Sequence, residues 1–208
     1  MKYIFYILIL VSVFYSCSYP VRKGYKKTDY NQILVLKSDF KKVIYRTSID
    51  VYKKHFSGIM LIKKIEADSS YRIVFLSELG MKIFDFEFNN NLPERFKIHY
   101  IVKPINKKLL INTLRKDFEL FLKIYPQKLN KESFVSGKNI IEKIKNNGLY
   151  NYYLFNTDSN YVTSITQKTW LFKKLLIKNN GFSMASPNNV KFEHKGINLK
   201  ISLFKINK

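Results

Sequence analysis

The sequence predicts an α+β fold in which an antiparallel sheet packs against an amphipathic helix. Its 208 residues suit one domain of ordinary size, and the 46% of hydrophobic residues can supply a packed core. Several runs place apolar side chains at every second position, as a half-buried strand does. One segment instead spaces them by three and four, as a helix does.

The strand pattern is clearest in the first half of the chain. Residues 43–54 alternate apolar and polar side chains. Residues 81–88 place three phenylalanines on one face, while Asp85 and Glu87 share the other face. Short turns separate these runs, which predicts an antiparallel meander with strands at 43–54, 56–65, 71–77, 81–88 and 95–102. Gly58, inside the second strand, predicts a bulge or a close approach of two backbones.

The helical pattern follows Pro104. Between residues 106 and 124, apolar side chains recur at spacings of three and four, and the segment ends before Pro126. Residues 127–148 are rich in Lys and Asn, with a short helix predicted at 136–146. The remaining predicted strands are 149–155, 161–169 and 170–178, followed by a C-terminal hairpin of 190–193 and 197–203.

The N-terminus has the features of an export signal. Lys2 precedes an uncharged apolar run at residues 3–14, which is too short to cross a hydrocarbon layer of roughly 30 Å. The run ends at Ser16 and at Cys17, the only cysteine of the chain. This junction resembles the lipobox of bacterial lipoproteins, in which a cysteine after a small residue is acylated. We therefore predict a signal peptide (1–16), a lipidated cysteine with a tether (17–32) and a single domain (33–208).

The resemblance to lipoproteins also implies a location. Ser18 follows the cysteine, and the sorting rule of diderm bacteria then implies the outer membrane, with the protein on its periplasmic face. The acyl chains would anchor the protein to the membrane without a transmembrane helix. The alternative is an ordinary secretory signal in which Cys17 is incidental.

The chain is strongly basic, with 37 Lys and Arg against 15 Asp and Glu and a net charge of +22. Such a charge can bind anionic lipid or nucleic acid. Lys outnumbers Arg 32 to 5 and the bases are spread along the chain, which favours a solvated surface. The scarcity of Arg, the usual reader of bases, argues against nucleic acid as a partner. A local cluster follows the predicted anchor and is expected to face the membrane surface; its members are Arg22, Lys23, Lys26 and Lys27.

The sequence contains no established catalytic or metal-binding motif. One cysteine excludes an intramolecular disulfide and a zinc site with several cysteines. The carboxylates Asp85 and Glu87 are explained by a solvent-facing row on a strand. His55, His99 and His194 are isolated in the sequence, so we predict none of them as a general base. We expect no enzymatic activity, no cofactor and no metal.

The order of elements resembles the outer-membrane lipoprotein-localisation proteins LolA and LolB. The resemblance lies in the strand at 56–62, which has an early glycine, and in the strands at 71–75 and 81–88. A chain with its own lipid anchor resembles the receptor LolB more than the soluble carrier LolA. The family implies a curved antiparallel sheet, an incomplete β-barrel covered by one or more amphipathic helices, with an apolar cavity that holds acyl chains.

An aromatic sheet face and an amphipathic helix can enclose such a cavity, or they can pack into a solid core. The sequence leaves both arrangements open. The residues expected to line the cavity, or to form the core in its place, are Met60, Ile62, Phe84, Phe86, Ile98, Leu110, Leu114 and Phe118.

Three functions follow as hypotheses. The leading one is a lipid-anchored envelope protein whose apolar cavity binds a lipid or an acylated protein, with a role in lipoprotein trafficking. The alternative is a structural or interaction lipoprotein with a solid core and a basic surface that faces the membrane. The third, a periplasmic hydrolase, requires acid and base groups that converge in a cleft.

Overall fold

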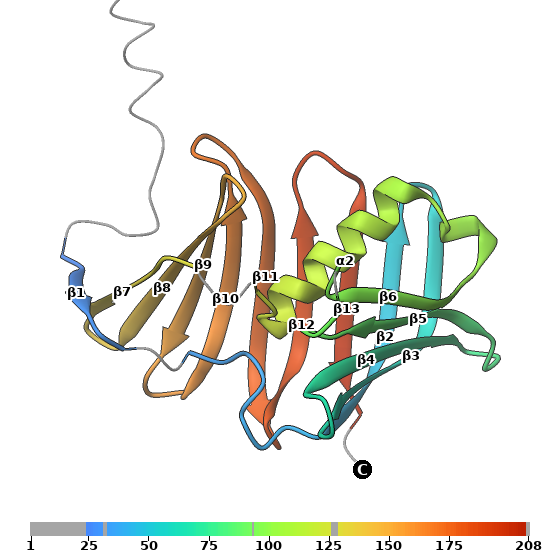
Figure 1. Ribbon diagram of the computed structural model, residues 1–208, viewed down its shortest axis with the longest axis horizontal. Helices are drawn as coiled ribbons and strands as arrows, with labels where there is room; N and C mark the ends of the chain where they lie inside the picture. The colour runs from blue at the N-terminus through green and yellow to red at the C-terminus, as the bar shows by residue number, and fades with distance from the viewer. Residues whose placement is uncertain (1–23, 31–32, 93, 126–128, 207–208) are drawn as a thin grey trace, which may run out of the picture.

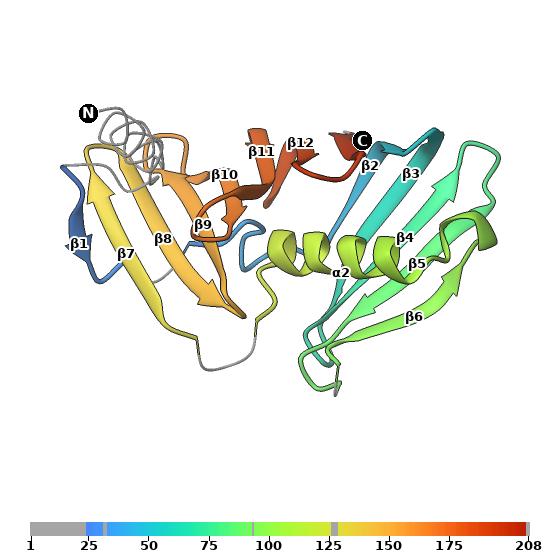
Figure 2. The ribbon, with the colours of Figure 1, turned by 90° about the horizontal axis from the view of Figure 1, so that it is seen from above.

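The computed structural model describes residues 24–30, 33–92, 94–125 and 129–206. These residues form one open sheet of 13 strands, which curves around a helix on its concave side (Figures 1 and 2). In sheet order the strands are β1 (Lys26–Thr28), β7 (Lys131–Ser136), β8 (Asn139–Asn146), β9 (Leu149–Asn156), β10 (Tyr161–Lys168), β11 (Lys173–Ser183), β12 (Ser186–His194), β13 (Leu199–Lys205), β2 (Lys42–Val51), β3 (Lys54–Ile65), β4 (Ser70–Ser77), β5 (Lys82–Phe88) and β6 (Phe96–Ile101). The paired strands are antiparallel throughout.

The α+β class predicted from the sequence is wrong. Strands make up 58% of the chain and helix only 10%, so the molecule is mostly β. Within the described residues there is one α-helix, α2 (Lys108–Leu122), preceded by the short 3-10 turn η1 (Lys103–Ile105). In place of the expected incomplete barrel covered by one or more helices, the described residues form one long open sheet with a single helix against it.

Part of this error comes from residues 127–148, where a short helix was predicted at 136–146. Residues 131–146 instead form the hairpin of β7 and β8. In β8, Ile140, Glu142 and Ile144 are buried at every second position, while Lys143 and Lys145 alternate with them. This is the strand period, but a glutamate at the central buried position hides it from a hydrophobicity pattern.

The other predicted strands are confirmed, with their ends shifted by a few residues. Strands β2 to β6 form the predicted meander, and β9 to β13 follow as a second run. The close approach predicted at Gly58 is also confirmed, because a Cβ at this position would lie 1.9 Å from the carbonyl oxygen of Leu76 in β4. Any larger residue would push β3 and β4 apart.

Aromatic packing holds α2 against the concave face. The ring of Phe118 lies 6.2 Å from that of Phe84 and 6.3 Å from that of Phe88, both on β5. It also lies 6.0 Å from Phe192 on β12, and Phe121 contacts the same ring at 5.8 Å. Edge-on and tilted ring pairs at these separations are favourable. They fix the helix across the middle of the sheet.

A buried ion pair fixes the C-terminal end of α2. Lys123 takes a left-handed backbone conformation just after the helix, with φ of 57°. Its ammonium pairs with the buried carboxylate of Glu142 on β8 and donates to the carbonyl of Ile33. Burial lowers the pKa of Lys123, and the carboxylate of Glu142 opposes that shift. Such a pair orients the helix, because either charge alone would be costly in the core.

Part of the predicted N-terminal organisation lies outside the described residues, namely the signal peptide, Cys17, Arg22 and Lys23. The end of the predicted tether is a strand, because Lys26–Thr28 forms β1 and pairs with β7 at the sheet edge. Lys26 and Lys27 are exposed there. Among the described residues, no helix has both the length and the apolar content needed to cross a bilayer.

Candidate functional site

Six of the eight residues predicted to line a cavity are fully packed. Phe84 stacks on Phe86 with ring centroids 4.4 Å apart, and it lies 5.5 Å from Phe75 on the next strand. Ile98, on the edge strand β6, is exposed. Leu110 lies near the start of α2, beside a surface pocket. The packed residues are Met60, Ile62, Phe84, Phe86, Leu114 and Phe118.

The pocket beside Leu110 has mainly apolar walls; we call it the rim pocket. It has a volume of about 580 Å³, within the range of small-molecule sites. Its walls come from the ends of β2 and β3, from the start of α2 and from the turn between β12 and β13. The apolar walls are Val51, Tyr52, Pro104, Leu109 and Leu110.

Lysines surround these apolar walls. Lys53, Lys54 and Lys107 all line the rim pocket, and no acidic residue does. Tyr52 and Leu109 remain largely exposed, so the pocket presents apolar surface to solvent under a positive rim. A concave apolar surface with a few charged groups at its mouth suits an amphiphile that carries a negative head group.

A second, more polar pocket of about 260 Å³ contains a histidine and an aspartate. Nε2 of His194 lies 3.0 Å from the carboxylate of Asp117, and Nδ1 donates to the carbonyl of Leu199 at 3.0 Å. Both side chains are buried. The pair links α2 to the turn between β12 and β13, and this turn also forms part of the rim pocket.

Opposing effects set the protonation of this pair. Burial lowers the pKa of His194, but the hydrogen bond and charge of Asp117 and the bond to Leu199 raise it above its ordinary value overall. Burial raises the pKa of Asp117, and the bond from His194 opposes that shift. Both ring nitrogens are occupied by protein acceptors, so neither is available to take a proton from a substrate. The geometry therefore favours a structural role over general-base catalysis.

All three histidines, isolated in the sequence, have a carboxylate partner in the structure. Nδ1 of His55 lies 2.6 Å from Asp50, and Nε2 of His99 lies 2.6 Å from Glu87. Within the described residues, no group of three or more His, Cys, Asp and Glu side chains could hold a metal ion.

The interpretation of Asp85 as a solvent-facing carboxylate is wrong. Asp85 is 3% exposed and accepts two hydrogen bonds from Arg72, at 2.5 and 3.0 Å, and one from Lys82 at 3.0 Å. Burial alone would raise the pKa of Asp85, but these cations hold it below its ordinary value. Glu87 pairs instead with His99. The two carboxylates thus have separate partners and do not form an acid pair.

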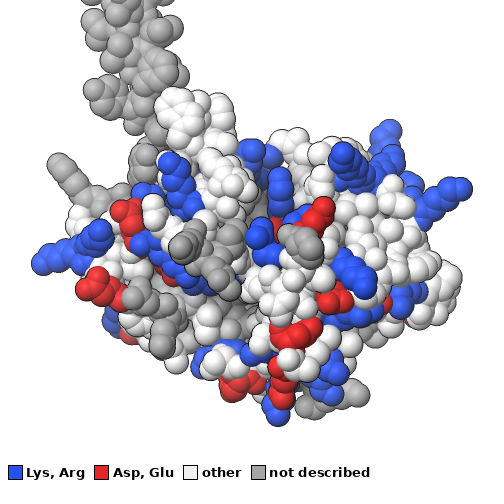
Figure 3. Space-filling view, viewed as in Figure 1, with Lys and Arg blue, Asp and Glu red and all other residues white. Residues whose placement is uncertain are grey.

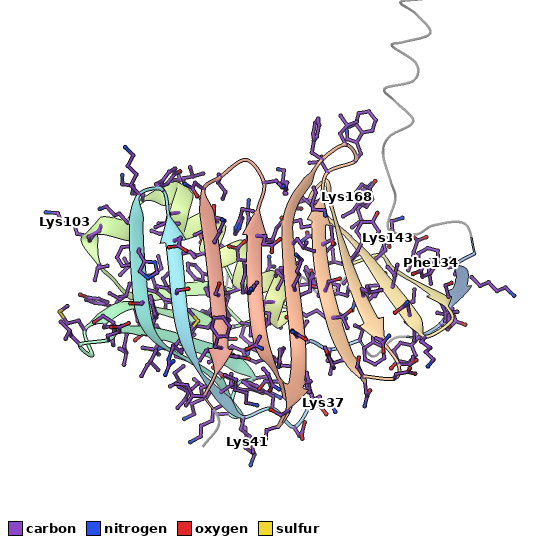
Figure 4. The ribbon with its side chains drawn as sticks, turned by 180° about the vertical axis from the view of Figure 1, so that it is seen from behind. Lys37, Lys41, Lys103, Phe134, Lys143 and Lys168 are labelled. Carbon is purple, nitrogen blue, oxygen red and sulfur yellow. The ribbon has the colours of Figure 1, made fainter. Side chains whose placement is uncertain are left out.

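Basic side chains are spread over the molecule. Figure 4 labels Lys37, Lys41, Lys103, Lys143 and Lys168, which come from different elements and extend from one side of the molecule to the other. Figure 3 shows the same dispersion on the opposite face, with acidic side chains mainly in its middle and lower part. Most of the charge therefore behaves as a solvated surface rather than as one binding patch.

The rim pocket was not among the predicted sites, although Leu110, one of the eight residues predicted to line a cavity, lines it. The pocket combines two turns with the start of a helix, so no single periodic segment contains it. The available signal was local: Tyr52-Lys53-Lys54 and Lys107-Lys108-Leu109 each place lysines next to an apolar side chain where an element begins or ends. The pairing of β2 with β13 brings the turn at Tyr52 beside Asn198, and both line the pocket together with the start of α2.

Comparisons with known proteins add no relative: no protein-family model, no curated protein and no solved structure matches this chain.

Proposed function

We propose that this chain is a lipid-anchored envelope protein that binds an acyl chain with an anionic head group in the rim pocket. The observation that carries this proposal is an apolar pocket of about 580 Å³ whose charged lining residues are all lysines. The predicted signal peptide and Cys17 support a location at the outer membrane, on the periplasmic face, where such lipids are the surrounding material. Free lipids and the acyl chains of other lipoproteins share this chemistry, so a role in lipoprotein trafficking fits the same site.

The walls and the rim supply different parts of the binding energy. Tyr52 and Leu109 offer most of the exposed apolar surface, and covering such surface stabilises a complex by about 25 cal/mol per Å². Lys53 and Lys107 attract the head group from a position where no acidic lining residue competes. The ligand would therefore lie with its chain against the start of α2 and its head group toward the lysines.

The proposal differs in place from the cavity expected between helix and sheet. That space is filled by the ring of Phe118 and its neighbours on β5 and β12. The rim pocket lies at the N-terminal end of the same helix, where the aromatic packing stops. Leu110 is the residue that the two descriptions share.

Titration of the full chain with a fluorescent long-chain fatty acid tests the proposal. Leu109→Asp places a negative charge on the pocket wall at an exposed position, where it can be accommodated without disturbing the core. We expect it to weaken binding by about tenfold or more, the equivalent of losing one apolar contact and repelling the head group. Leu79→Asp, at an exposed position in the turn between β4 and β5, is the matched control and should bind as the wild type does. Equal affinities in the two variants would refute the pocket.

A second candidate function is favoured by the packed core. Because the space between helix and sheet is solid, the chain can also act as an interaction lipoprotein that uses its basic surface and takes up no ligand. Native mass spectrometry of the full chain with its co-purified lipids separates the two. A bound acyl species that Leu109→Asp releases supports the pocket, and an empty wild-type protein supports the second candidate.

A further inference from the structure

The turn between β10 and β11 exposes an unusual group of apolar side chains. Trp170 is 67% exposed, Phe172 is 69% exposed and Leu171 between them is 37% exposed. We call Thr169 to Phe172 the aromatic tip. Aromatic side chains contribute most when they are removed from water, so two of them at the end of a hairpin indicate a surface that is covered by a partner.

The backbone of the aromatic tip is ordered by its own hydrogen bonds. The N–H of Thr169 donates to the carbonyl of Phe172 at 2.9 Å. The hydroxyl of Thr169 accepts from the N–H of Phe172 at 2.9 Å and from that of Leu171 at 3.3 Å. Three of the tip's N–H groups are thus satisfied internally, which reduces the cost of moving the tip into an apolar phase. The side chains are presented on a preformed turn.

The charges beside the aromatic tip have one sign. Lys173 and Lys174 follow it directly and are both exposed. Lys195, in the next turn, donates its backbone N–H to the carbonyl of Lys174 at 2.8 Å. Two acidic groups on adjoining elements are paired with cations of their own, Glu193 with Lys178 and Asp117 with His194. Apolar aromatic residues flanked by lysines match the interface of an anionic bilayer, which takes rings at the head-group level and attracts cations.

We propose that the aromatic tip inserts into the head-group region of an anionic lipid bilayer and docks the sheet on the membrane surface. This contact is separate from the proposed acyl pocket, because a pocket can bind lipid without any part of the protein entering a bilayer. It is also separate from the predicted lipid anchor, which lies at the other end of the chain.

Hydrogen bonds connect the aromatic tip to the rim pocket. The turn that contains Lys195 continues to Asn198, whose carbonyl accepts from the N–H of Tyr52 at 2.8 Å. The amide of Asn198 donates back to the carbonyl of Tyr52 at 3.3 Å. Figure 1 shows the three turns side by side along the upper margin of the molecule. Insertion of the tip would therefore hold the mouth of the rim pocket near the lipid surface.

The chain provides its own probe for this proposal, because Trp170 is its only tryptophan. The full chain is mixed with vesicles of phosphatidylcholine and phosphatidylglycerol, and the tryptophan emission is recorded. We expect a shift to shorter wavelength and quenching by lipids with brominated acyl chains. Emission is the readout rather than co-sedimentation, because the apolar segment at residues 3–14 can bind vesicles by itself. Vesicle-bound protein whose Trp170 still emits as in water would overturn the proposal.

Matched variants assign the effect to the tip. The double substitution Leu171→Ser and Phe172→Ser should raise the lipid concentration needed for the emission shift by about tenfold or more. Met184→Ser, which alters a 79% exposed side chain at the other end of β11, should leave it unchanged. Lys173→Glu with Lys174→Glu should weaken the shift by at least about tenfold, since each lysine contributes about fivefold near an anionic surface. The control, Lys41→Glu with Lys42→Glu at the start of β2, should leave the emission shift unchanged.

The outcomes also separate this proposal from the acyl pocket. Leu109→Asp should lose fatty-acid binding in solution, whereas the double substitution at the tip should keep it. If the tip variant and Met184→Ser respond equally to vesicles, the docking surface is wrong while the pocket stands.

Discussion

The strands of the sheet are joined by two rows of turns, one at each end of the strands, and these two rows differ in chemistry. The turns at 52–53, 78–81, 147–148, 169–172 and 195–198 form one edge, which we call the tip edge. It exposes Tyr52, Leu79, Met81, Trp170 and Phe172, and Glu78 is the acid among its turn residues. The turns at 66–69, 89–95, 137–138, 157–160 and 184–185 form the opposite edge. Among its described turn residues, Met184 is the large exposed hydrophobic, and the acids are Glu66, Asp68, Glu94 and Asp158.

This difference indicates that the functional surface lies at the tip edge. An antiparallel sheet needs turns at both ends of its strands, and polar or glycine-rich turns are sufficient for folding at either end. The opposite edge follows this rule. The tip edge instead exposes aromatic and apolar side chains in its turns, at a cost in solubility that folding alone does not require. The rim pocket opens on the same edge.

The largest expected effect is on the stability of the packing between α2 and the sheet, which supports the turns at both ends of the strands. Phe118→Ala removes the ring that contacts β5 and β12 and should lower the free energy of unfolding by about 3–5 kcal/mol. Phe204→Ala, at a half-exposed position on β13, is the control and should cost about 1 kcal/mol or less. Urea unfolding, followed by circular dichroism, measures both. Similar losses in the two variants would show that the contact of α2 with the sheet is not a main source of stability.

A smaller effect on stability is expected at the contact between Asp117 of α2 and His194, next to the tip edge. Asp117→Asn removes the carboxylate beside His194 and should cost about 1–3 kcal/mol near pH 6.5. The raised pKa of His194 gives the wild type a stabilising contribution that is complete below the unfolded pKa of about 6.5. That contribution is lost as the pH rises through the folded pKa of His194.

The variant lacks the partner that raises this pKa, so above pH 6.5 its stability should change little. Urea titrations at several pH values above 6.5 measure the difference between the two proteins. A gap that stays constant with pH would mean that His194 is not charged in the folded wild type.

The smallest effect is expected at the opposite edge. Lys138 and Asp158 form an ion pair at 2.5 Å, but both side chains are more than half exposed. Exposed pairs contribute about 0–1 kcal/mol, so Lys138→Ala should leave thermal unfolding almost unchanged and should not alter vesicle binding. A loss of vesicle binding in this variant would extend the membrane contact to the opposite edge and break the contrast.

The strands were predictable where every second side chain was apolar. Residues 81–88 illustrate this, since three phenylalanines on one face give β5 its buried side. The helix α2 was predictable for the same reason, with Leu114 and Phe118 one turn apart. The hairpin of β7 and β8 was not, because Glu142 occupies a buried position that its ion pair with Lys123, nineteen residues earlier, makes tolerable.

The candidate sites were harder to predict, since they depend on contacts between distant segments. His194 appeared isolated because Asp117 precedes it by 77 residues. The rim pocket needs Tyr52 next to Asn198, which the pairing of β2 with β13 supplies. The aromatic tip was visible in the sequence as Trp170-Leu171-Phe172, but it was assigned to the start of a strand. In the structure β11 begins at Lys173, where it pairs with Lys168, so the three side chains lie in a turn.

Hydrogen–deuterium exchange of the full chain, with and without vesicles of phosphatidylcholine and phosphatidylglycerol, tests the contrast between the edges most directly. We expect vesicles to slow the exchange of peptides containing residues 169–174, 195–198 and 52–54. Peptides containing residues 157–160 and 184–185 should exchange at unchanged rates. Equal protection at both edges, or protection confined to the opposite edge, would contradict this expectation.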